Sequence, residues 1–114
     1  MAETKVAERN QTTPTEKVEY RYRVTPRYGL YFENGKWILE VALPGVNKDK
    51  VTLKVLDDYL QLRAGRDQIL YTLDLEFDFK VEKEKITASY KEGLLKLEMV
   101  PYNPLDHAHI VKIE

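Results

Sequence analysis

Apolar and polar residues alternate along most of the chain, with the period of two that is typical of β-strands. The longest run places apolar side chains at every second position: Leu73, Leu75, Phe77, Phe79 and Val81. A helix repeats its apolar positions every three or four residues, so this run excludes an amphipathic helix. No window of similar length has helical spacing, and turn residues recur every eight to twelve positions. The pattern therefore predicts an all-β protein, an antiparallel immunoglobulin-like sandwich of about seven strands.

Turn residues divide this pattern into strands. Asn34-Gly35 supplies the two residues with positive φ that a tight hairpin needs. Leu43-Pro44-Gly45 ends the second strand of this hairpin, because proline cannot donate to a ladder and glycine permits a reversal. We expect strands at residues 28–32, 36–43, 51–56, 59–64, 69–79, 86–90 and 94–100, with a marginal edge strand at 18–24.

The segment from Ala88 to Leu97 predicts a second hairpin, in which a glycine-bearing turn separates two strands. Gly93 is the expected pivot, since a residue without Cβ takes positive φ at no steric cost. After the turn, Leu95, Leu97 and Met99 fall on one face, so the second strand is expected to lie on the core.

Both ends of the chain are expected to be arms outside the sandwich of residues 28–101. Residues 1–27 begin with a polar stretch that lacks periodicity and cannot bury enough apolar area to offset its ordering entropy. Residues 102–114 contain a proline at position 104 and mixed polarity, which describes an extended arm. The sequence thus predicts a flexible N-terminal arm, one domain and a flexible C-terminal arm.

The C-terminal arm ends in an apolar cluster, Ile110, Val111 and Ile113. In extended conformation Val111 and Ile113 point the same way, so the pair could fill two pockets at a sheet edge. Burying both is worth roughly 3 to 6 kcal/mol before the cost of ordering the arm. Alternatively, the cluster folds back as the last strand of its own domain.

Composition narrows the function. The chain has 114 residues with 18 Lys+Arg against 19 Asp+Glu, so no net field directs it to nucleic acid or an acidic membrane. It has no cysteine, which excludes disulfides, thiolate catalysis and cysteine-ligated zinc. It contains no phosphate loop, no serine triad candidate and no HExxH motif, so neither catalysis nor a cofactor is expected. Without an apolar leader or spanning segment, the expected location is the cytoplasm.

Two groups of side chains invite a metal-site interpretation. Asp74, Glu76 and Asp78 place three carboxylates on one strand face about 7 Å apart, either as a calcium or acid/base site or as a solvated face that discourages aggregation. His107 and His109 face one way in an extended arm and are either metal ligands or ordinary linker residues. The charged face and the linker are the favoured interpretations, and no metal is expected.

Aromatic and cationic residues interleave in Tyr20-Arg21-Tyr22-Arg23, as they do in proteins that bind single-stranded nucleic acid. The slightly acidic balance and the lack of a glycine-aromatic motif argue against this function. An edge strand or a client-contacting arm is the favoured interpretation.

Three separated motifs resemble those of the small heat-shock proteins, the α-crystallin domain family, over about residues 28–114. They are Ala88 followed by Gly93 and Leu95, the Leu43-Pro44-Gly45 turn, and the terminal Val111-Lys112-Ile113. In that family the terminal motif docks in a groove between the fourth and eighth strands of a neighbouring subunit. The resemblance implies that the groove here is lined by Val51, Leu53, Val55, Ile86, Ala88 and Tyr90.

The resemblance also implies a function, an ATP-independent holdase that assembles with itself and binds partly unfolded client proteins. Many members dimerise by swapping a strand in a long loop, but residues 64–69 leave no room for that loop. Pairing edge to edge through the long strand is the alternative, with a possible dimer edge at Leu73, Asp74, Leu75, Glu76 and Phe77. The missing loop also makes the monomeric CS-domain co-chaperones a rival, since their sandwich is similar.

Overall fold

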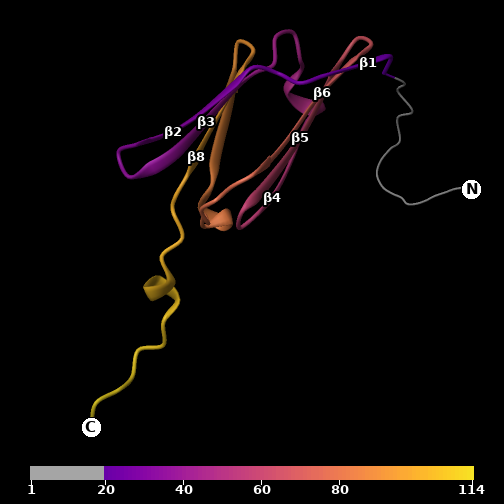
Figure 1. The fold of residues 1–114 in the computed structure, drawn as a ribbon. Helices are drawn as coiled ribbons and strands as arrows, with labels where there is room; N and C mark the ends of the chain where they lie inside the picture. The colour runs from indigo at the N-terminus through magenta and orange to yellow at the C-terminus, as the bar shows by residue number, and fades with distance from the viewer. Residues whose placement is uncertain (1–19) are drawn as a thin grey trace, which may run out of the picture.

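The computed structural model describes residues 20–114, which form two four-stranded β-sheets packed face to face (Figure 1). The first sheet has the order β1 (Tyr22–Val24), β6 (Ile69–Glu76), β5 (Tyr59–Arg66), β4 (Val51–Leu56). The second has the order β2 (Tyr28–Glu33), β3 (Lys36–Ala42), β8 (Leu94–Met99), β7 (Thr87–Lys91). Short 3₁₀ turns lie at η1 (Lys48–Lys50), η2 (Lys83–Lys85) and η3 (Pro104–His107). The predicted all-β sandwich is confirmed.

β1 is the only strand of the described chain that pairs in parallel, against the start of β6. It lies within the predicted edge strand at 18–24, of which residues 18 and 19 fall outside the described residues. The predicted N-terminal arm at 1–27 likewise falls outside them up to residue 19. The hydroxyl of Tyr20 rests on Gly65, where a Cβ would collide with the ring. The absence of a side chain at Gly65 thus leaves room for Tyr20, which precedes β1, to pack against β5.

Tight turns connect the hairpins as predicted. Asn34 and Gly35 both have positive φ, 54° and 77°, which is the twist that a two-residue hairpin requires. Glu92 and Gly93 do the same between β7 and β8, at 48° and 81°. Gly93 also meets the proline turn, because a Cβ there would lie 3.3 Å from Pro44 Cα. The turn at Gly93 and the Leu43-Pro44-Gly45 turn therefore contact each other at one end of the sandwich.

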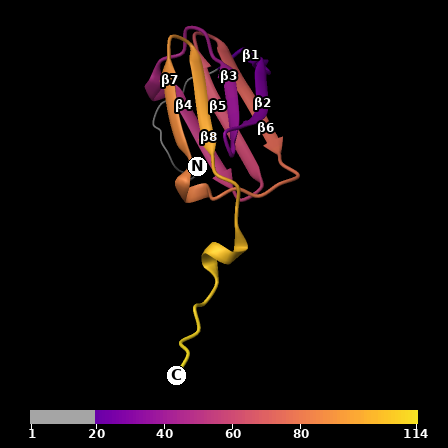
Figure 2. The same ribbon diagram turned by 90° about the vertical axis from the view of Figure 1, so that its left-hand side faces the viewer.

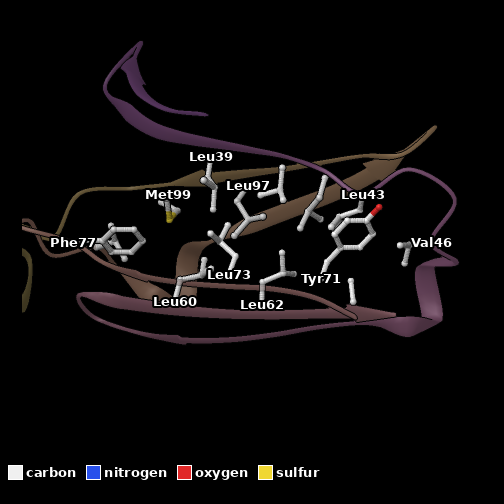
Figure 3. Packing of buried hydrophobic residues seen from close by; sticks show 14 residues of the cluster. Leu39, Leu43, Val46, Leu60, Leu62, Tyr71, Leu73, Phe77, Leu97 and Met99 are labelled. Atoms are coloured by element: carbon white, nitrogen blue, oxygen red, sulfur yellow. The ribbon is translucent and has the colours of Figure 1, made fainter. Parts of the chain in front are cut away.

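The core lies between the two sheets, built from the inward residues of four strands, β3, β5, β6 and β8, and of the loops between strands (Figure 3). Leu39, Leu60, Leu62 and Leu97 are fully buried. Leu95 and Met99 are also buried, as their alternation with polar neighbours predicted.

The predicted strand at 69–79 is too long, because β6 ends at Glu76. Beyond this point the N–H of Phe77 still donates to Asp58 O of the β4–β5 turn at 2.8 Å, and the chain reaches the second sheet at the isolated bridge between Val81 and Pro101. Phe77 stacks on Phe79 with ring centroids 4.8 Å apart, and Phe79 stacks on Trp37 at 4.1 Å. The apolar alternation continues past the strand because these rings close the end of the core.

After β8 the C-terminal arm leaves the sandwich and points away from it (Figures 1 and 2). Ile110, Val111 and Ile113 are 89%, 70% and 92% exposed. The alternative in which the terminal cluster forms the last strand of its own domain is therefore wrong. Within residues 20–114, no helix has the length and apolar character to cross a bilayer.

Candidate docking groove and C-terminal arm

A hollow of about 190 Å³ opens between the edge strands of the two sheets. β4 and β7 occupy the last place in their sheets and lie on the same side of the sandwich (Figure 2). The residues that line the hollow are Lys48, Val51, Ala88, Ser89, Tyr90 and Leu95. Three of the predicted groove residues, Val51, Ala88 and Tyr90, are therefore brought together by strands far apart in the sequence.

The other predicted groove residues lie along the same two edges. Leu53 and Val55 follow Val51 at every second position of β4, and Ile86 comes directly before β7. All three are half-buried and pack against the core cluster. We call this side of the sandwich, with its six predicted residues, the β4–β7 groove.

Tyr90 fixes one wall of the groove. Its hydroxyl lies 2.7 Å from both Leu43 O and Val46 O, so β7 is tied to the loop that follows β3. A half-buried tyrosine finds a polar partner for its hydroxyl while its ring stays in apolar surroundings. Sequence patterning did not indicate these carbonyl partners, nor Lys48 and Leu95 as lining residues.

Both edge strands also present backbone groups to an incoming peptide. The outer N–H and C=O groups of an edge strand have no partner strand, and an extended segment can add to them. The β4–β7 groove thus combines apolar side chains with two open backbone edges.

A buried carboxylate anchors the root of the C-terminal arm. Glu82 has a side chain that is only 10% exposed, and its Oε2 lies 2.9 Å from His107 Nε2. The N–H of Asn103 also donates to Glu82 at 3.4 Å, and the ring of Tyr102 stacks on that of His107. His107, predicted as a linker residue, is in fact the contact that holds the arm, and sequence patterning did not identify Glu82.

The anchor is expected to weaken in acid. The hydrogen bond from His107 lowers the pKa of Glu82 from an ordinary value of 4.5, against an opposing effect of burial. A lowered carboxyl pKa stabilises the folded form above the ordinary value, and this stabilisation is lost as the pH falls through the folded pKa. Glu82→Gln should therefore release the arm already at neutral pH, seen as loss of the ring-current shift of Tyr102 by NMR. Glu84→Gln, an exposed neighbour, should leave that shift unchanged.

The predicted dimer edge is divided between core and surface. Leu73 and Phe77 are buried in the core, and Leu75 is half-buried. Asp74 and Glu76 face solvent, and Asp74 pairs with Arg63 at 2.8 Å. β1 covers the edge of β6 as far as Tyr71, so only the stretch from 72 to 76 is open.

Neither metal-site interpretation gains support from the part of the chain that the structure describes. No group of three or more His, Cys, Asp or Glu residues is placed there to hold an ion. Asp74 is engaged by Arg63, and His107 by Glu82.

The chain was compared with known proteins. No family model matches it. It is 26% identical over 106 residues to small heat shock protein C4 of Rickettsia felis, covering 79% of this chain and 64% of that protein. It is 27% identical over 84 residues to the 18 kDa heat shock protein of Clostridium acetobutylicum, covering 59% and 56%. The chain therefore matches less than two thirds of the length of these curated relatives.

The fold is similar to that of a solved heat shock protein. Heat shock protein 16.0 from Schizosaccharomyces pombe superposes with a TM-score of 0.66 at 15% identity, over 81% of this chain and 77% of that one. In the chain itself, Asp67-Gln68 alone joins β5 to β6, which leaves no long loop between them. In sequence and in fold the chain is therefore similar to small heat-shock proteins, and it has no long loop between β5 and β6.

Proposed function

We propose that the protein is an ATP-independent holdase that assembles by docking the C-terminal arm of one copy into the β4–β7 groove of another. The observation that carries this proposal is that one chain has both an apolar arm end and an apolar groove, and that the two do not contact each other within the chain. Val111 and Ile113 are exposed at the end of the arm, while Val51, Ala88 and Tyr90 line a hollow between the two edge strands. The described arm points away from its own groove, so a second copy is the natural receiver (Figure 2).

The energetics favour a labile assembly. Burial of Val111 and Ile113 contributes roughly 3 to 6 kcal/mol, part of which is offset by the entropy of ordering the arm. One arm alone therefore binds weakly, at about millimolar affinity. Several arms acting together bind strongly through effective concentration, while each contact still opens and closes.

An open groove would serve clients in the same way. Partly unfolded proteins expose extended apolar segments, and such a segment can add to an edge strand while its alternate side chains fill apolar hollows. Release of an arm exposes the groove, and a client segment then binds there through non-covalent contacts alone. Arms and clients thus compete for one surface.

Heating an aggregation-prone client and following its light scattering tests this function. The chain should suppress scattering without ATP, and Ala88→Arg should abolish most of the suppression by filling the groove with a bulky cation. Thr52→Arg is the matched control, since Thr52 is exposed on β4 and does not line the hollow. Equal suppression by both variants would contradict the proposal.

The two-residue link between β5 and β6 favours a second candidate, a monomeric interaction module of the CS-domain type. Such a module would recognise one folded partner and would leave a heated client unprotected. A monomeric mass together with unchanged client scattering would support this candidate instead.

A further inference from the structure

β2 has an open edge whose hydrogen-bonding groups can be assigned. It is the first strand of the second sheet, and β3 is its only partner among the described strands. The carbonyl of Arg27 accepts from Ala42 N–H at 2.9 Å, and the ladder keeps this register to the turn at Asn34-Gly35. Bonded and free positions alternate along an antiparallel strand. The N–H and C=O groups of Tyr28, Leu30 and Phe32 therefore point outward, away from β3.

This edge is also apolar and unprotected. Tyr28 is 48% exposed and Phe32 54% exposed, although both lie on the inner face of the sheet. Edge strands that must remain single usually carry lysine, proline or a bulge. The six residues of β2 include no lysine and no proline, the ladder to β3 has no bulge, and the single charged residue, Glu33, lies at the end of the strand.

We infer that β2 pairs with β2 of a second copy of this chain, antiparallel, about a two-fold axis at Leu30. Hydrogen bonding requires that outward-pointing residues face each other, which restricts the register to even-numbered partners. Placing Leu30 opposite Leu30 also sets Tyr28 opposite Phe32 on both sides of the axis. This register joins all three free positions, with about six hydrogen bonds, whereas a shift of two residues loses one pair.

The side chains are self-complementary in the same register. Arg27 of each copy lies opposite Glu33 of the other, and neither residue has an ion-pair partner within residues 20–114. Tyr28 faces Phe32, an aromatic cross-strand pair of the kind that stabilises sheets. The strand thus carries opposite charges at its two ends and aromatic rings between them.

A hollow on the outer face of the sheet receives the remaining pair. Gly29 lies opposite Tyr31 of the second copy, and a Cβ at position 29 would meet nothing within 4 Å. The surface around Gly29 is a shallow, open hollow whose lining residues include Arg27, Glu40 and Leu94. Aromatic rings cover glycines on neighbouring strands in this manner. Tyr31 of the second copy would close the hollow above Gly29.

The open stretch of β6 fits a second copy less well. Antiparallel self-pairing centred on residue 74 would set Asp74 against Asp74, and like charges directly opposite each other destabilise a sheet. β2 and the β4–β7 groove lie at opposite edges of the sandwich, so one copy can use both at once (Figure 2). The β2 pair does not depend on arm docking, and each can fail without the other.

Cysteine cross-linking tests the register, because the chain has no cysteine of its own. In the full chain, Leu30→Cys places two thiols on the axis with Cα atoms about 5.5 Å apart, within the range that a disulfide spans. Tyr31→Cys is the matched control, since its Cα atoms are about 7 to 8 Å apart, too far to bridge. Under mild oxidation, Leu30→Cys should give about tenfold more disulfide dimer than Tyr31→Cys. Equal yields from the two variants would overturn the β2 pair.

A charge exchange on exposed residues provides a second test that leaves the core intact. Arg27→Glu should weaken the dimer about tenfold in sedimentation equilibrium, because two carboxylates then oppose each other at both ends of the pair. Glu33→Arg should do the same through opposed cations. The double variant should restore the dimer, whereas a double variant as weak as the singles would overturn the proposal.

Discussion

If arms dock into grooves of other copies, a chain that carries Val111→Gly together with Ile113→Gly is expected to sediment as a dimer or monomer, at a lower mass than the unchanged chain. Under the proposed function, the substitutions remove the apolar contacts between arm and groove, roughly 3 to 6 kcal/mol for each arm. Because several arms act together in one assembly, their losses combine. The measurement is sedimentation velocity of the variant and the unchanged chain at matched concentration.

Lys112→Gly provides the control for this variant. It adds the same backbone freedom to the same segment, but it removes a side chain that points away from Val111 and Ile113 in an extended arm. It should keep the mass of the unchanged chain. If the double glycine variant also keeps that mass, the terminal cluster does not hold copies together.

Leu97→Ala is expected to cause the largest loss of folding stability, about 2 to 5 kcal/mol. Leu97 is fully buried between the sheets and lies opposite Ala88 of β7 (Figure 3). Truncation leaves a cavity behind the groove that neighbouring side chains fill only in part. Chemical unfolding followed by the fluorescence of Trp37 measures the change in the free energy of unfolding.

The matched substitution is Leu105→Ala on the arm. Leu105 is 80% exposed, so its loss should change the free energy of unfolding by less than about 0.5 kcal/mol. Similar losses for both variants would show that the core described between the sheets is not what stabilises the fold.

The local rules of sequence explain why the sandwich could be predicted. Asn34-Gly35 and Gly93 mark turns because positive φ is costly for other residues, and both turns lie where these residues stand. The alternation through Leu95, Leu97 and Met99 also identified the inner face of β8, and all three residues are buried. A shift in register by one residue would turn these apolar side chains toward solvent.

Features that depend on contacts between distant segments were missed or predicted wrongly. β6 stops at Glu76 because the chain must cross to the other sheet, although the apolar alternation runs on. The pairing of Glu82 with His107 joins two polar residues that no periodicity connects. Prediction of the groove relied on the family resemblance, because Val51 and Ala88 become neighbours only once both sheets are stacked.

A cross-link between two differently substituted copies tests whether the arm of one copy occupies the groove of another. One copy carries Ile113→Cys and the other Ala88→Cys, while Lys54→Cys, exposed on the outer face of β4, replaces Ala88→Cys in the control. Mixing is expected to give a disulfide between Ile113→Cys and Ala88→Cys chains at a yield well above that of the control. A mixed disulfide no more abundant than the control, or one that forms within a single chain carrying both substitutions at high dilution, would contradict it.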